Sequence, residues 1–113
     1  RLPSRVPYAV AMEMALTADP ITAEKGAEYG LVSRVTKKGG AVEGAMELAD
    51  RIARNAPLSV AASKQMIQAV QGRTEAEFWE HQRPVMAAVF SSEDAKEGPK
   101  AFAEKRPPSW SGR

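Results

Sequence analysis

Between Ala41 and Asn55 the apolar residues recur with the period of an α-helix. They are Val42, Ala45, Met46, Ala49, Ile52 and Ala53, and charged residues fill the opposite side. This spacing predicts an amphipathic helix over 41–55. Aromatic residues make up only 6% of the 113 residues, and Ala and Met carry much of the apolar content. A core of this kind favours helix packing over a β-sandwich, so we expect a mainly α chain.

Proline and glycine divide the rest of the N-terminal half into helices. An apolar helix is predicted after Pro7, and it breaks at Asp19-Pro20 because a residue before proline is pushed out of the α region. Thr22 caps a short helix that stops at Gly30. The next segment, "LVSRV" at 31–35, is the one strand-like run. A single strand leaves its backbone groups unpaired, so it requires a neighbour from outside these residues.

Three further helices are predicted in the C-terminal half. Pro57 opens one that Gly72 ends, and a capping box at Thr74 opens the next, with a kink or restart near Arg83 because Pro84 lies inside it. One face of this helix carries a stripe in which Gln82 is the polar member: Phe78, Gln82, Val85, Met86, Val89 and Phe90. Ser91 or Ser92 caps the last helix, which Pro107-Pro108 stops, and Trp110 is the one aromatic anchor of the polar tail after it.

Composition excludes several classes of site. The chain has no Cys and a single histidine, His81, so we expect no disulfide, no thiolate nucleophile and no metal site. The net charge of +2 comes from alternating charges and not from a basic block, so no nucleic-acid partner is expected. No apolar run approaches the roughly 20 residues of a membrane span. A cytoplasmic location is the expectation, and Arg1 in place of Met suggests a segment of something longer.

Phe102 and Lys105 form the one constellation with a binding interpretation. On a single helix face, a flat ring and a cation three residues apart suit a ligand with an aromatic base and phosphates. The alternative is that Phe102 packs into a core while Lys105 is solvated, and spacing alone favours that alternative. From the residues alone, no active site is visible.

Three motifs, in order, resemble the crotonase superfamily and look most like its enoyl-CoA hydratases. They are "AMEMALTADPITAEKGAEYGLVSRV" at 11–35, the stretch at 45–64 that follows the pattern "ALELA-x-x-I-A-x-x-P-L-x-V-x-x-x-K", and "SEDAKEGPKAFAEKRPP" at 92–108. The resemblance covers essentially the whole chain. It implies the C-terminal helical, trimerisation region of a crotonase-like α/β spiral fold, with 1–35 ending the spiral core and 41–113 forming the oligomerisation and CoA-covering part.

The resemblance also implies a function. Members of this family add water to 2-enoyl-CoA thioesters in fatty-acid or related acyl-CoA metabolism, or isomerise them, without a separate cofactor. Their oxyanion hole and catalytic glutamates lie upstream of the matching region, so no catalytic residue is assigned here. By motif position, Phe102 and Lys105 correspond to residues that touch the adenine and phosphate part of coenzyme A across a subunit boundary. The implied partners are acyl-CoA and further copies of the chain, as a trimer or dimer of trimers.

Two functions therefore stay open. The first is the association and CoA-covering segment of a hydratase-like enzyme, and the second is a stand-alone helical interaction module without catalysis. The apolar first helix and the unpaired strand favour the first, since both require partners. The sequence departs from the family where Ala18 replaces a helix-ending glycine and where Pro84 and Pro99 fall inside expected helices.

Overall fold

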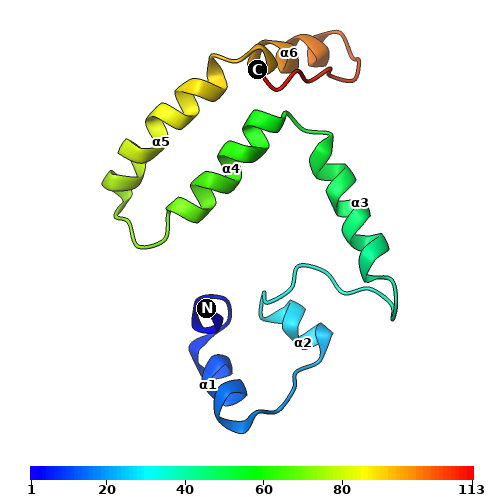
Figure 1. Cartoon of the computed structure of the whole chain (residues 1–113), viewed down its shortest axis with the longest axis vertical. Coiled ribbons are helices and arrows are strands. Elements are labelled where there is room, and N and C mark those ends of the chain that lie inside the picture. Colours follow the sequence, from blue (N-terminus) through cyan, green and yellow to red (C-terminus); the bar gives the residue numbers. More distant parts are fainter. The chain divides into compact units, whose positions relative to one another are not determined.

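The computed structural model describes residues 1–113 and divides into two compact units, Arg1–Met46 and Glu47–Arg113. Every regular element is a helix, so the mainly α prediction is confirmed. Figure 1 labels these elements along the chain. None of the helices has the length and apolar character needed to cross a bilayer.

The first unit contains a 3-10 turn and two helices. The turn η1 (Leu2–Ser4) packs against α1 (Tyr8–Thr17), and Val6 and Ala11 are the buried hydrophobic residues there. The helix α2 (Ala23–Glu28) begins at Thr22, whose hydroxyl accepts the Lys25 N–H at 3.2 Å, as predicted.

The strand expected at 31–35 is not formed, and that prediction is wrong. The segment is irregular, and the N–H groups of Leu31 and Val32 both donate to the Gly26 carbonyl at the end of α2. A run of this composition forms a strand only where another strand supplies hydrogen-bond partners, and every regular element of the two units is a helix.

Ala18 ends α1 in the left-handed conformation, with φ of 60°. Glycine adopts this conformation without the contact between Cβ and the carbonyl oxygen that an L residue suffers. We expect Ala18→Gly to raise the free energy of unfolding by about 1 kcal/mol, measured by thermal or urea denaturation. The matched control is Ala15→Gly in the interior of α1, which should lower it by about 1 kcal/mol. A lower stability for Ala18→Gly would contradict the argument.

The helix α3 (Ala41–Ala53) confirms the amphipathic prediction, but its apolar stripe is uncovered. Val42 is 74% exposed, and Met46 and Ile52 are exposed on the same face. Asn55 ends the helix, because its side-chain amide donates to the carbonyls of Arg51 (3.0 Å) and Ile52 (3.2 Å). An apolar helix face of this kind requires a covering polypeptide.

An antiparallel pair of helices builds the second unit. Figure 1 shows α4 (Pro57–Ala69) and α5 (Glu75–Phe90) side by side, joined by the turn that contains Gly72. Ala62 and Met66 are buried on α4. The stripe predicted on α5 is half-buried except at its last member, Phe90, which is 73% exposed.

The capping box that opens α5 is formed as predicted. The Thr74 hydroxyl accepts the Glu77 N–H (3.3 Å), and the Glu77 carboxylate accepts the Thr74 N–H (2.8 Å). The helix then runs unbroken through Pro84, so the expected restart near Arg83 does not occur. Pro84 has no N–H and so removes one backbone hydrogen bond from the helix. The contacts between α4 and α5 hold the rest of the helix in place.

Candidate functional site

The last helix, α6 (Glu93–Ala103), begins at Ser92 and ends before Lys105. The Ser92 hydroxyl accepts the Ala95 N–H at 3.1 Å, which selects Ser92 over Ser91 as the cap. At the other end, the Lys105 N–H donates to the Phe102 carbonyl (3.2 Å) and the Arg106 N–H to the Ala101 carbonyl (3.1 Å). These two bonds form a Schellman motif, in which Lys105 occupies the left-handed position usually held by glycine, with φ of 52°.

Phe102 and Lys105 therefore do not share a helix face as the sequence predicted, because α6 ends between them. The structure still brings their backbones together through the bond from Lys105 N–H to the Phe102 carbonyl. Phe102 is 86% exposed and the buried residue beside it is Ala101, so Phe102 is not part of a core within this chain. Lys105 is also exposed and has no ion pair.

Arg106 is bound on two sides by carboxylates. Its Nη1 and Nη2 donate to the two oxygens of Glu97, at 2.6 and 3.0 Å, and its Nε donates to Glu104 at 2.6 Å. The Ser109 N–H adds a bond to Glu97 Oε1 at 2.7 Å. These bonds, with Arg106 the largest influence, lower the pKa of Glu97 from its ordinary 4.5 to about 2 and raise the pKa of Arg106. We call Glu97 and Arg106 the α6 clamp.

The low pKa of Glu97 predicts acid sensitivity of this end of the chain. Because the folded pKa lies below the unfolded one, the stabilisation is complete above pH 4.5 and is lost as the pH falls towards about 2. Acid titration followed by tryptophan fluorescence in a Trp79→Phe background, where Trp110 is the remaining tryptophan, should show this loss within that window. In Glu97→Gln the transition in this window should flatten, and an unchanged transition would assign it to other carboxylates.

Residues 107–113, which we call the C-terminal tail, lie along α6. Asp94 is only 4% exposed, and its carboxylate accepts the Ser111 N–H (2.7 Å), the Ser111 hydroxyl (3.0 Å) and the Gly112 N–H (3.0 Å). These bonds, led by that from the Ser111 backbone, lower the Asp94 pKa. The Arg113 carbonyl in turn accepts the Glu93 N–H at 2.7 Å, at the start of α6.

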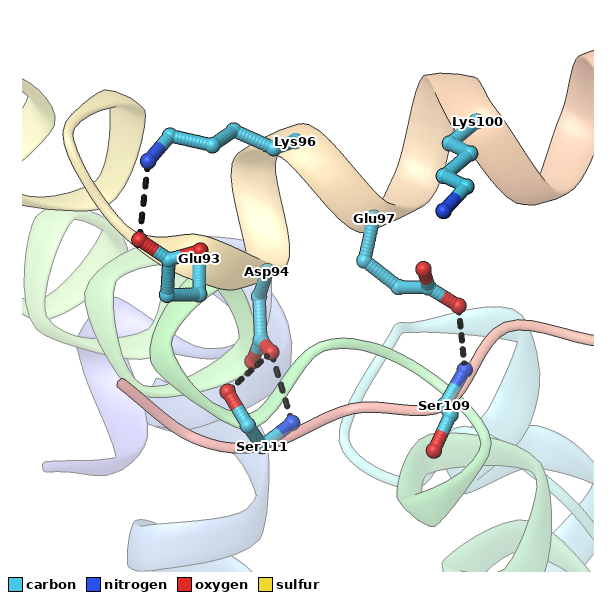
Figure 2. Close-up of a pocket in the computed structure, with 7 residues that line it drawn as sticks. All are labelled: Glu93, Asp94, Lys96, Glu97, Lys100, Ser109 and Ser111. Atoms are coloured by element: carbon cyan, nitrogen blue, oxygen red, sulfur yellow. Dashed lines mark hydrogen bonds and ion pairs between the residues drawn. The ribbon is translucent and has the colours of Figure 1, made fainter.

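Figure 2 shows the bonds between Asp94 and Ser111 and between Glu97 and Ser109. The hollow that these residues line has a volume of about 330 Å³. Asp94 and Glu97 point from α6 towards Ser111 and Ser109 of the tail, while Lys96 turns outward to Glu93. Two of the carboxylates in the hollow, those of Asp94 and Glu97, are bound to tail donors, while the Glu93 carboxylate pairs with Lys96. The arrangement therefore fastens the tail to α6.

Trp110 joins the tail to the corner between α3 and α4. Its Nε1–H donates to the Arg54 carbonyl at 2.8 Å, and its ring stands against Gly98 of α6. Trp110 also borders a largely apolar hollow of about 560 Å³, lined in addition by Ile52, Val60 and Lys64. The anchoring role expected for Trp110 is confirmed.

Sequence reasoning missed the bonds that hold the tail. Glu97 and Arg106 were not among the residues singled out from the sequence. Glu97 and Arg106 lie nine residues apart on either side of the end of α6, so their ion pair does not follow from local spacing. The one sequence signal that the chain turns back here is the Pro107-Pro108 stop. His81, the single histidine of the chain, lies half-buried on α5 beside the Glu80–Arg83 ion pair. No group of three His, Asp or Glu side chains is arranged to hold a metal ion.

The family model for enoyl-CoA hydratase/isomerase matches residues 1–113. The chain belongs to the enoyl-CoA hydratase/isomerase family, which confirms the resemblance seen in the three motifs.

Among curated relatives, enoyl-CoA hydratase EchA19 of Mycobacterium tuberculosis is 42% identical over 113 residues, covering all of this chain and 42% of that protein. Carnitinyl-CoA dehydratase of Proteus mirabilis is 41% identical over 117 residues and is covered over 45% of its length. The chain thus spans less than half the length of these relatives.

Solved structures show the same fold. An enoyl-CoA hydratase from M. tuberculosis H37Rv superposes with a TM-score of 0.95 at 45% identity, covering 100% of this chain and 45% of that one. A probable enoyl-CoA hydratase/isomerase from Mycobacterium abscessus gives 0.91 at 49% identity, with the same coverage. The helices described above therefore correspond to less than half of each solved chain.

Proposed function

We propose that this chain supplies the subunit-association and CoA-covering region of an enzyme that adds water to 2-enoyl-CoA thioesters. Family membership over residues 1–113 supports the class of enzyme. The names of the relatives, a hydratase and a dehydratase, both describe addition or removal of water on a CoA thioester. Acyl-CoA is accordingly the proposed substrate, with no separate cofactor.

The observation that carries the proposal is the exposure of Phe102 beside an unpaired Lys105. A phenylalanine that is 86% exposed contributes nothing to its own fold, and it loses water contact only when something packs on it. An aromatic base can stack on the ring while an ammonium pairs with phosphate. The adenine and phosphate part of coenzyme A combines both groups.

Uncovered apolar faces support the association role. Beyond Phe102, the stripe of α3 and the Phe90 side chain of α5 are exposed. Each lies on a well-formed helix, and apolar faces of this size are covered in stable proteins. We propose that they are covered by other polypeptide of the same enzyme, in a trimer or a dimer of trimers.

The experiment is an intact-mass measurement of the purified protein with hydration of a short 2-enoyl-CoA assayed on the same sample. A mass more than twice 12.2 kDa with turnover supports the hydratase function. A mass of 12.2 kDa without turnover leaves a non-catalytic helical module, for which CoA binding is the remaining property to measure. Phe102→Ala and Lys105→Gln should each weaken CoA binding about tenfold. Unchanged affinity in both would contradict the proposed site.

A further inference from the structure

Lys105 occupies a backbone conformation that its side chain disfavours. Its φ of 52° places it in the left-handed region, where an L residue brings Cβ close to a carbonyl oxygen. Non-glycine residues in this region persist only where the surroundings hold them. The Schellman bonds to Ala101 and Phe102 alone would be satisfied equally by glycine.

The neighbours on both sides of Lys105 are tied to each other. The Arg106 Nε donates to the Glu104 carboxylate at 2.6 Å, so an ion pair closes around the single residue between them. Arg106 is held in addition by the two parallel bonds to Glu97, which lies nine residues earlier on α6. A guanidinium matches a carboxylate in this paired geometry and fixes direction as well as distance.

The same bonds remove one cation from those available at this end of α6. Arg106 is committed to two carboxylates, whereas neither Lys100 nor Lys105 makes an ion pair. Of these two free cations, Lys105 is the one whose backbone N–H bonds to the Phe102 carbonyl, so it is the cation that adjoins the exposed ring.

We propose that Glu97 and Arg106 are positioning residues that hold Lys105 in its left-handed conformation and so fix where its ammonium meets the phosphate groups of an acyl-CoA. This inference rests on the proposed CoA-binding role of Phe102 and Lys105. The two clamp residues are bound to each other. Their contribution to affinity passes through the backbone of Lys105.

A double-mutant cycle on CoA binding tests the inference, with coenzyme A as the probe in titration calorimetry on the purified protein. Arg106→Lys keeps the charge but loses the paired bonds. It should weaken CoA binding about fivefold when Lys105 is present and have no further effect in a Lys105→Gln background. If Arg106 has a purely structural role, Arg106→Lys should weaken CoA binding by the same factor in both backgrounds. That result would overturn the inference.

Controls separate this inference from the function on which it rests. Lys105→Gln with unchanged affinity would overturn the proposed site and the positioning role together. If Lys105→Gln weakens CoA binding, but Arg106→Lys weakens it by the same factor with or without Lys105, the positioning role alone would be overturned. Lys96→Gln, which removes an exposed cation of α6 paired with Glu93, should leave affinity unchanged. If Arg106→Lys fails to fold, Glu97→Gln is measured in the same cycle with the same expected pattern.

Discussion

Replacing Trp110 with alanine is expected to lower the free energy of unfolding of the Glu47–Arg113 unit by about 2–3 kcal/mol. The side chain is half-buried, so the loss lies below that of a fully buried tryptophan. Its removal abandons the ring contact with Gly98 and leaves the Arg54 carbonyl without its donor. Because that bond joins residues 56 positions apart, its loss frees the C-terminal tail from the start of α4.

Trp110→Phe separates the two contributions. It keeps a ring against Gly98 and removes the N–H, so it should cost about 1 kcal/mol, the usual net value of one hydrogen bond. Chemical denaturation followed by circular dichroism measures both variants. Equal losses for alanine and phenylalanine would mean that the hydrogen bond, and not the ring, accounts for the effect. No loss in either variant would show that the tail is not fastened by Trp110.

Local chemistry made most of the helices predictable from the sequence. The capping box at Thr74, the cap at Thr22 and the amphipathic period of α3 each depend on residues within a turn or two of one another. Signals of this kind are read directly from spacing. They place helix starts well, but they do not show what covers a helix.

The wrong predictions share a physical cause, which is that they depended on distant parts of the chain. "LVSRV" has the composition of a strand, yet strand formation is a property of a pair, and these units contain no partner. Of the kink or restart expected near Arg83, the restart does not occur, because α5 packs on α4 and stays continuous through Pro84.

The candidate site was only half predictable for the same reason. Phe102 and Lys105 were chosen from residue type and motif position, but spacing put both on one helix face. The actual end of α6 is set by the Schellman bonds and by the α6 clamp, whose two residues are nine positions apart. A left-handed lysine is not expected from propensity, so its position became visible only once the bonds around it were known.

Replacing Asp94 with alanine should release the C-terminal tail from α6. Three donors from two tail residues lose their acceptor, since both the backbone and the hydroxyl of Ser111 and the backbone of Gly112 bond to this carboxylate. Hydrogen bonds to a charged group are among the stronger ones in proteins, and here the carboxylate is shielded from water. Amide hydrogen exchange at Ser111 and Gly112 should therefore accelerate by at least about tenfold.

The control for this variant lies one residue away. Glu93→Ala also removes a carboxylate from the first turn of α6, so it reproduces the loss of the favourable interaction with the helix dipole. Its side chain pairs only with Lys96 and makes no bond to the tail, while its backbone N–H still donates to Arg113. If Glu93→Ala speeds exchange at Ser111 as much as Asp94→Ala does, the tail is held by the helix terminus as a whole. A difference between the two variants assigns the fastening to the Asp94 carboxylate, because the dipole contribution is common to both.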